Sequence, residues 1–284
     1  MSSTSGIGLT VVVPTYGQGR DLRPLIQSIE SSRPGPFEVL IIVNHPSRSR
    51  EYSEMIAKMS DQVEVLESPE VGTNYARNYG AQRAKGRWLL FLDDDCRFTT
   101  PDQLLRVLRL AEHSPDVAFG GFYRTPVSGT FTQRLYNFIS NAWLTLYKKD
   151  EASAYTFLGG AFLIQSDQFE KVGGFDEEVQ GAGEEWSLAK KLYPTTVSLS
   201  GELNVWHSFV GGMTQFWRKK VGRVGGGLSE AHQRSFKEKV FALFRECARG
   251  GRRSFFAMFL WRLYGPIYIG VLESRKSKDR WRHR

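Results

Sequence analysis

The chain has 284 residues with a net charge of +8, and 41% of them are hydrophobic and 24% charged. These values exclude an intrinsically disordered chain, and the length suffices for one large α/β domain with an appendage. The two cysteines, Cys96 and Cys247, form neither a disulfide framework nor a zinc-binding spacing, so we expect a reducing compartment. No basic segment precedes the first apolar run and no stretch reaches the ~20 apolar residues of a membrane span, so we expect neither a signal peptide nor a transmembrane helix.

The first part of the chain alternates short apolar runs with segments of helical character. The apolar runs predict strands at Leu9–Val13, Phe37–Val43, Val63–Leu66, Trp88–Leu92 and Val117–Phe122. Helices are predicted between them, at Asp21–Ser31, Arg50–Met59, Gly72–Lys85 and Pro101–His113. This alternation indicates βαβ units and a parallel sheet, in which the loops after the first, second and fourth strands meet at one edge.

The second part departs from this alternation. Helices are predicted at Phe131–Tyr147, Ser166–Val172 and Glu184–Tyr193, and strands at Tyr155–Ile164, Thr196–Leu199 and Leu203–Trp206. The first of these strands carries the pair Gly159-Gly160, where the missing side chains let another group approach closely. We therefore expect an α/β domain over residues 1–210, with a mostly parallel central sheet flanked by helices, followed by a helical appendage over residues 211–284.

The positive charge is concentrated at the carboxyl-terminal end. Residues 245–284 contain eleven Lys or Arg and three Asp or Glu, a net charge of +8 that equals that of the whole chain. Seven aromatic residues are interleaved with these charges, and an apolar stretch accompanies them. This pattern favours peripheral contact with anionic lipid headgroups. A nucleic-acid surface and an ordinary packed helix with a solvated tail are the alternatives.

Three carboxylates, Asp93, Asp94 and Asp95, follow the buried run Trp88–Leu92 without a break. Adjacent like charges at the end of a strand repel one another, and a divalent metal with oxygen ligands is a common way to hold them together. Ligands of open α/β sheets bind at this end of the strands. The alternative is a solvated acidic turn that caps the next helix. Cys96 comes directly after the triplet, and without a neighbouring base we expect a small, half-buried residue rather than a nucleophile.

Other polar positions also have ordinary explanations. Glu184 and Glu185 could be acids that face the positive end of a helix dipole. His207, next to a tryptophan, could be a hydrogen-bonded core histidine. Arg77 could be an exposed residue of its helix.

Four segments carry a further pattern: VVVPTYGQGRDLRPLIQSI, GTNYARNYGAQRAKGRWLLFLDDD (Gly72–Asp95), GGAFLIQSDQFEKVGGFDEEVQGAGEEWSLAKKL (Gly159–Leu192) and VWH (Val205–His207). Together they cover about residues 9–210. In this order and at these spacings, they resemble the segments of family 2 glycosyltransferases, which have the GT-A fold.

The resemblance implies an enzyme that moves a sugar from a nucleotide-diphosphate donor to a hydroxyl acceptor. It implies that Asp93 holds the ribose side of the nucleotide and that Asp95 ligates a Mn²⁺ or Mg²⁺ ion bridging the two phosphates. Asp94 lies between them in the same donor site. His207 stands where some members supply a further metal ligand. Both ions accept a few protein ligands together with substrate phosphates.

The resemblance also implies which residues surround the nucleotide. Pro14, Thr15 and Tyr16 would line the nucleoside pocket, and Arg77 would lie under the donor. Asn44 stands where the family commonly has an aspartate that contacts the base or the ribose. An amide accepts a hydrogen bond there and also donates one, so the base preference is open.

The reaction needs a carboxylate that accepts the proton of the attacking hydroxyl. Glu184 and Glu185 occupy the place where the family usually has Glu-Asp, and we expect Glu185 to be the base, with Glu184 as the other candidate. Gly160 would let the donor sugar approach the backbone. One base without a second nucleophile implies a single displacement with inversion at the anomeric carbon.

The predicted function is a metal-dependent, inverting, hexosyltransferase-type enzyme at the cytoplasmic, inner face of a membrane. Its acceptor would be a hydroxyl of a cell-surface glycan or a lipid-linked acceptor. A catalytically silent nucleotide-sugar-binding or scaffold protein is the alternative, which the departures at Asn44 and Glu185 permit. We expect no nucleic-acid partner, because residues 1–244 are close to neutral.

Overall fold

The computed structural model describes residues 7–17, 20–32, 35–45, 50–147, 157–179, 184–193 and 197–208. The chain divides into two units, Met1–Gly211 and Gly212–Arg284, and every described residue belongs to the first. The predicted helical appendage and its basic tail lie outside the described residues, so the domain prediction stays a prediction. In the described part, no helix has both the length and the apolar character that a membrane crossing requires.

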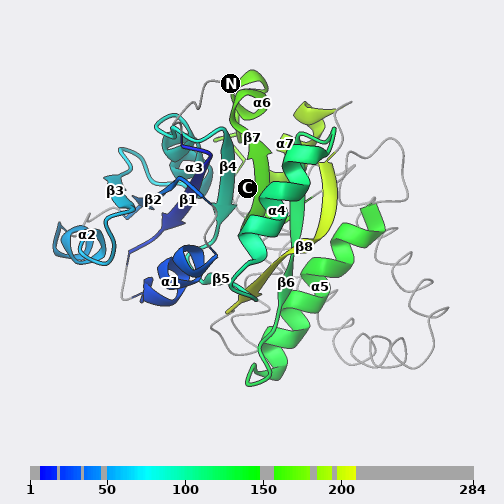
Figure 1. Ribbon diagram of the computed structural model, residues 1–284, viewed down its shortest axis with the longest axis horizontal. Coiled ribbons are helices and arrows are strands. Elements are labelled where there is room, and N and C mark those ends of the chain that lie inside the picture. Colours follow the sequence, from blue (N-terminus) through cyan, green and yellow to red (C-terminus); the bar gives the residue numbers. More distant parts are fainter. Residues whose placement is uncertain are drawn as a thin grey trace, which may run out of the picture. The chain divides into compact units, whose positions relative to one another are not determined.

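One sheet of eight strands organises the first unit (Figure 1). Its order is β3-β2-β1-β4-β7-β6-β8-β5. β1, β2, β3 and β4 are mutually parallel, and so are β6 and β8, whereas β7 runs antiparallel to both neighbours and β5 antiparallel to β8. The strands are β1 Leu9–Thr15, β2 Phe37–Val43, β3 Val63–Glu67, β4 Trp88–Leu92, β5 Cys96–Phe98, β6 Ala118–Arg124, β7 Ala161–Gln165 and β8 Val197–His207.

Helices flank this sheet, as the alternation in the sequence predicts, so the α/β class with a mostly parallel sheet is confirmed. They are α1 Arg23–Ser31, α2 Arg50–Ala57, α3 Thr73–Ala81, α4 Gln103–His113, α5 Phe131–Tyr147, α6 Ser166–Lys171 and α7 Glu184–Leu192. In Figure 1, α4 crosses in front of the strands, and α1 lies beside β5. The helices that the sequence predicts up to residue 193 all exist, with ends that differ by a few residues.

Three strand predictions needed correction. The strand predicted at Tyr155–Ile164 begins only at Ala161, because Gly159 and Gly160 form a tight turn in which the Ala161 amide donates to the Leu158 carbonyl. The two short strands predicted after residue 195 are one strand, β8, whose pairing with β6 shifts register between Gly120 and Phe122. The three-residue strand β5 was not predicted at all.

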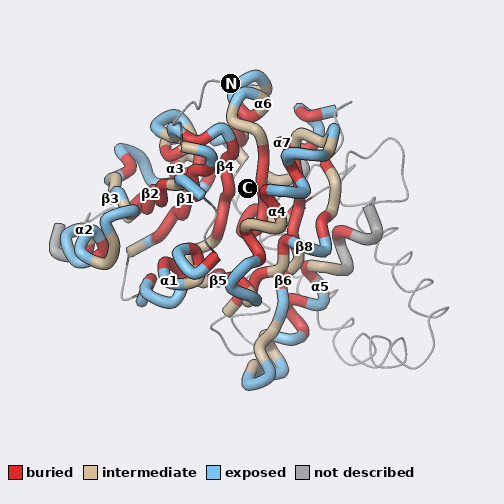
Figure 2. The backbone as a smooth tube through the Cα atoms, in the orientation of Figure 1, coloured by how far each residue is buried: buried red, intermediate tan, exposed pale blue. Residues whose placement is uncertain are grey.

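The central strands form the core, and every residue of β1 and β4 is buried (Figure 2). α3 lies close against the sheet because Gly80 faces it; a Cβ at this position would come within 2.6 Å of Val12 Cγ1. A cluster of aromatic rings continues the same core: Phe91 lies 5.0 Å from Phe169 and 5.3 Å from Phe175 between ring centroids, and the latter two are 5.6 Å apart. The polar ends of these strands are therefore held on a rigid base.

The sheet order brings three segments that are distant in the sequence to one place. β1 and β4 are neighbours, so Thr15 and the aspartates after Leu92 emerge side by side. The antiparallel pairing of β5 with β8 sets Cys96 opposite His207, which carries the histidine to the end of the aspartate triplet. This is the edge of the sheet at which ligands of α/β proteins bind.

Candidate active site

Asp94 ties β4 to the segment after β1. Its carboxylate accepts a hydrogen bond of 2.8 Å from the Thr15 hydroxyl and lies 3.2 Å from Nε of Arg20. Burial raises the pKa of Asp94 above its ordinary value, and the neighbouring carboxylates add to this, whereas Arg20 and the Thr15 hydroxyl lower it. Asp94 is thus engaged mainly by the protein itself.

Asp93 is held from two other elements. Nη2 of Arg77, on α3, donates to one carboxylate oxygen at 3.0 Å, and the Tyr123 hydroxyl, on β6, donates to the other at 3.1 Å. Burial raises the pKa of Tyr123 well above its ordinary value, so this phenol keeps its proton and remains a donor. The orientation of Asp93 is therefore fixed on both sides.

The pair Gly159-Gly160 makes room for this arrangement. A Cβ on Gly160 would overlap Oδ2 of Asp93 and lie 2.6 Å from the Tyr123 hydroxyl, and one on Gly159 would lie 2.9 Å from Nη2 of Arg77. The sequence correctly predicts a close approach at these glycines. The groups that approach them, however, are the protein's own carboxylate, phenol and guanidinium.

Asp93, Asp95 and His207 form a cluster with the donor set of a metal site. Each offers one ligand atom, and these atoms all lie within 4.8 Å of one another. Nε2 of His207 is 3.5 Å from Oδ1 of Asp95, and Arg20 approaches the other oxygen of Asp95 at 3.8 Å. Two carboxylates and one imidazole suit Mn²⁺, and a mostly oxygen set also suits Mg²⁺. The residues present therefore fit the predicted cation.

Arg77 has hydrogen-bonding capacity that the described part of the protein does not use. The residue is only 3% exposed, and Nε and Nη1 are buried without a hydrogen-bond partner among the described residues. Its guanidinium lies 5.2 Å from the centre of the Phe175 ring. Leaving buried donors unpaired is costly, so this cation suits an anionic or hydroxyl-rich ligand beside Asp93. The alternative considered from the sequence, that Arg77 is an exposed residue of its helix, is therefore wrong.

Glu184 and Glu185 begin α7 and are partly buried. Glu185 accepts a hydrogen bond of 3.3 Å from the amide of Gly159, the residue that also borders Arg77. One carboxylate oxygen of Glu184 is buried without a hydrogen-bond partner among the described residues. The contact to Gly159 places Glu185 beside the wall of the aspartate cluster, so a proton acceptor and a candidate metal site lie together.

The residues predicted for the nucleoside lie around the ends of β1 and β2. Pro14 is buried within β1, whereas Tyr16 is 53% exposed and meets the His45 ring edge-on at 4.6 Å. Asn44 is buried, and the oxygen of its side-chain amide accepts a 2.8 Å hydrogen bond from the backbone amide of Gly72, at the start of α3. An exposed aromatic ring beside a buried amide can bind a planar, hydrogen-bonding group.

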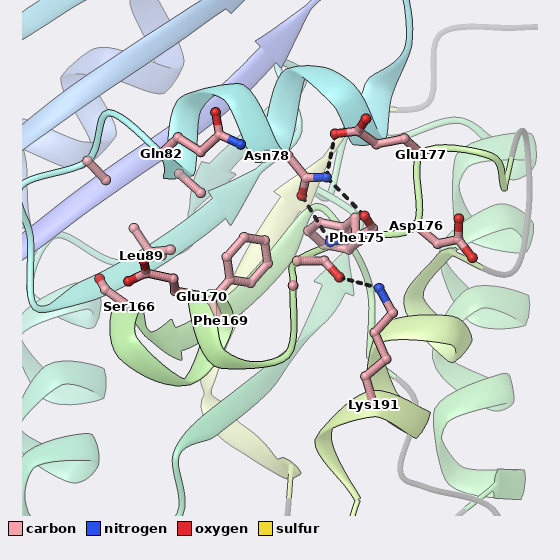
Figure 3. A pocket seen from close by; sticks show the side chains of 14 residues that line it. Asn78, Gln82, Leu89, Ser166, Phe169, Glu170, Phe175, Asp176, Glu177 and Lys191 are labelled. Carbon is pink, nitrogen blue, oxygen red and sulfur yellow. Dashed lines mark hydrogen bonds between the residues drawn. The ribbon is translucent and has the colours of Figure 1, made fainter.

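The segment that leads toward α7 is fixed by asparagines of α3. α6 ends in a Schellman motif, in which Gly173 and Gly174 have φ of 72° and 64° and bond back to the carbonyls of Glu170 and Phe169. Asn78 then bonds to both backbone groups of Phe175 (Figure 3). The side-chain NH₂ group of Asn74 donates to the carbonyls of Asp176 and Val179, further along the same segment.

A pocket lies behind this segment, as Figure 3 shows. Asn78, Phe169, Phe175 and Lys191 are among the residues that line it, and Lys191 donates to the Gly174 carbonyl. None of the predicted site residues lines this pocket. It is therefore separate from the aspartate cluster, and its polar groups serve to hold the glycine turn.

The structure adds three residues that the sequence analysis does not single out: Arg20, Tyr123 and Asn137. Arg20 and Tyr123 contact the aspartates, and Asn137 contacts His207. No local pattern marks them, because each acts across a long sequence separation. Cys96, expected to be half-buried, is fully buried, and burial raises its pKa well above the usual range, so it is not a thiolate nucleophile.

The fold and the site define a class: α/β proteins with an acidic site that can hold a metal at the carboxyl ends of parallel strands. Residues 10–173, more than half of the chain, match the sequence profile described as glycosyl transferase family 2. The chain belongs to this family. The family assignment and the GT-A fold expected from the four segments are confirmed.

Relatives and solved structures agree with this assignment. An uncharacterized glycosyltransferase of Haemophilus influenzae is 36% identical over 111 residues, which are 39% of this chain and 37% of that protein. Glycosyltransferase GlyA of Streptococcus pneumoniae is 23% identical over 228 residues, 75% of this chain and 32% of that protein. The chain thus spans about a third of the length of these two relatives.

Two structural similarities show the fold. The mannosyltransferase PcManGT of Pyrobaculum calidifontis, solved with GDP-Man and Mn²⁺, has a TM-score of 0.59 at 16% identity, covering 92% of this chain and 81% of that one. TarS 1-349 of S. aureus, solved with UDP-GlcNAc, has a TM-score of 0.55 at 16% identity, covering 80% and 69%.

Substitution of Gly160 tests the geometry of the cluster. We expect Gly160→Ala to displace the carboxylate of Asp93, because the added methyl group overlaps it, and to weaken Mn²⁺ binding by roughly ten- to a hundredfold, the usual range for disturbing the surroundings of a metal ligand. Electron paramagnetic resonance titration of Mn²⁺ measures the affinity. Gly201→Ala on β8 is the control, because a Cβ there meets nothing within 4 Å. Unchanged Mn²⁺ affinity in a folded Gly160→Ala protein would contradict the geometry.

Proposed function

We propose that this family 2 glycosyltransferase is a metal-dependent, inverting enzyme that transfers a sugar from a nucleoside-diphosphate donor to a hydroxyl acceptor. One observation carries the proposal: the Asp93–Asp95–His207 cluster and the carboxylate of Glu185 both border the turn at Gly159 and Gly160. A metal-binding donor set next to a proton acceptor is what such a transfer needs.

Departure of the nucleoside diphosphate leaves negative charge on the phosphate oxygens, and a bound Mn²⁺ or Mg²⁺ would stabilise that charge. Asp95 and His207 would hold the ion, with Asp93 contributing a carboxylate oxygen. Arg77 supports the same end of the donor, since its unused N–H groups are buried beside Asp93 and suit a phosphate or sugar oxygen.

The acceptor hydroxyl would lose its proton to Glu185 as its oxygen forms the new bond to the anomeric carbon. The bond from that carbon to the diphosphate breaks at the same time, and its electron pair leaves with the phosphate oxygen. The hydrogen bond from the Gly159 amide orients the Glu185 carboxylate, which would accept the proton of the acceptor hydroxyl. One displacement of this kind inverts the anomeric carbon.

The donor's base and sugar are not assigned. Of the structural neighbours, one was solved with GDP-Man and another with UDP-GlcNAc, which supports a nucleoside-diphosphate sugar as the class of donor. For the acceptor, we propose a hydroxyl of a cell-surface glycan or glycolipid at the cytoplasmic face of a membrane. The net charge of +8 in residues 245–284 supports this location.

The metal requirement can be measured by thermal unfolding with UDP, GDP, CDP, ADP and dTDP, each with and without Mn²⁺. A ligand at a hundred times its Kd stabilises the folded state by ~2.7 kcal/mol, which raises the Tm by about 5–10 °C for a protein of this size. We expect a shift with one nucleotide that requires Mn²⁺ and disappears in Asp95→Asn. Absence of any shift would favour the alternative of a scaffold protein, and a shift that is independent of Mn²⁺ would contradict the metal role.

Glu185→Gln separates binding from proton transfer. We expect nucleotide affinity to stay within a few-fold of wild type and turnover to fall by 10²–10⁴, the usual contribution of a general base. Glu184→Gln, at the same end of α7, is the matched control, and we expect it to retain most of the wild-type turnover. If Glu184→Gln loses turnover instead and Glu185→Gln keeps it, the assignment of the base is wrong.

Membrane contact can be tested by co-sedimentation of the full chain with vesicles of phosphatidylglycerol or of phosphatidylcholine, and by titration with duplex DNA at the same salt. We expect binding to the anionic vesicles only, and we expect salt to weaken it. Each basic residue removed from the carboxyl-terminal segment should make the binding free energy less favourable by about 1 kcal/mol. Substitution of Lys276, Lys278 and Arg280 by glutamine provides the comparison. Binding to DNA but not to anionic vesicles would overturn the proposal.

A further inference from the structure

Asn137 lies in α5, is 2% exposed and joins three elements through its side-chain amide. The NH₂ group donates to the carbonyl of Arg124 at 3.1 Å, to the hydroxyl oxygen of Thr125 at 2.8 Å and to the carbonyl of His207 at 3.2 Å. Two of these partners are carbonyl oxygens, which only accept. A reversed amide would set oxygen against oxygen at both, so the position of the NH₂ group, and hence of the amide oxygen, is fixed.

That amide oxygen lies 2.9 Å from Nδ1 of His207. An amide oxygen accepts and cannot donate, so Nδ1 must carry a proton for this contact to be a hydrogen bond. A proton on Nε2 alone would leave two lone pairs facing each other at 2.9 Å between buried groups, which is costly. The alternative contact, from Nε2 to Asp95, is longer at 3.5 Å.

The ring plane of His207 is fixed as well. Tyr123 stacks on it at a centroid distance of 4.1 Å and an interplanar angle of 10°, and Tyr136 lies at 5.3 Å and 15°. Tyr123 also donates to Asp93, so one phenol orients two members of the cluster. With Nδ1 and the ring plane both set, the direction of Nε2 toward Asp95 follows.

We propose that Asn137 is a positioning residue: it keeps the proton of neutral His207 on Nδ1 and thereby presents Nε2 as a ligand to a divalent cation at Asp93 and Asp95. Histidine ligands of metals generally need such a partner on the other ring nitrogen. The inference rests on the proposed function, because the cation belongs to it. The protonation of the ring can be measured without any metal, so the two can fail separately.

The first experiment reads the tautomer in the wild-type protein. The ring nitrogens of ¹⁵N-labelled histidine are observed by NMR at a pH at which the ring is neutral, without metal and with saturating Mg²⁺, which is diamagnetic. The chain has five histidines, and the signal that disappears in His207→Gln identifies this one. We expect the proton on Nδ1 in both samples. A neutral His207 with its proton on Nε2 overturns the inference.

The second experiment measures Mn²⁺ affinity by electron paramagnetic resonance in Asn137→Leu. Leu removes the acceptor, so we expect a roughly ten- to a hundredfold loss of affinity, the range found for groups that orient metal ligands. Asn141→Leu is the control: Asn141 lies one turn further along α5 and bonds the backbone of Tyr123.

The outcomes separate the two proposals. Equal Mn²⁺ affinity in folded Asn137→Leu and wild type overturns the role of Asn137, and so does an equal loss in Asn141→Leu, which would indicate a general effect of α5. Wild-type protein that binds no Mn²⁺, alone or with UDP or GDP, overturns the metal role in the proposed function and the purpose assigned to Asn137 with it. If the variants do not fold, the tautomer in the wild type still decides the inference.

Discussion

Three adjacent carboxylates at the end of a fully buried strand are the constraint on which the rest of the site depends. β4 is apolar throughout, so it provides no compensation for Asp93–Asp95. The positive groups come instead from other elements: Arg20 follows β1 and Arg77 lies on α3. Because these partners lie on elements that are distant in the sequence, the surroundings of the triplet form only when those elements come together. The site and the fold are therefore specified together.

The parallel half of the sheet could be predicted from the sequence because burial on both faces produces continuous apolar runs. Val39–Val43 and Trp88–Leu92 are such runs, and the bounds of β2 and β4 agree with the prediction. The convergence of Thr15 with the aspartates also follows, since the carboxyl ends of neighbouring parallel strands share an edge. Physical rules of this kind depend only on local pattern and on chain direction, and both can be read from a sequence.

The antiparallel half could not be predicted to the same extent, for reasons visible in particular residues. β5 has three residues, one of them exposed, and forms because β8 pairs with it across more than a hundred positions. Ser200 and Gly201 look like a turn, yet β8 continues through them. Asn137 is one of several polar residues in an aromatic-rich helix, and what distinguishes it is its contact with His207, seventy positions away. Long-range pairing of this kind leaves no local signal.

The two departures from the family pattern are compatible with chemistry at this site. Glu185 has one more methylene than the aspartate usual in the family, but the Gly159 amide binds one of its oxygens and limits where the longer side chain can go. At Asn44, the side-chain oxygen already accepts a hydrogen bond from the Gly72 amide. The side-chain group that remains for a ligand is therefore the NH₂ donor, whereas an aspartate at this position would present an acceptor. A ligand atom bound there must therefore accept a hydrogen bond. The departure at residue 44 thus changes which hydrogen-bonding groups the proposed nucleoside site can recognise, and the departure at residue 185 changes only the reach of a carboxylate that the backbone already holds.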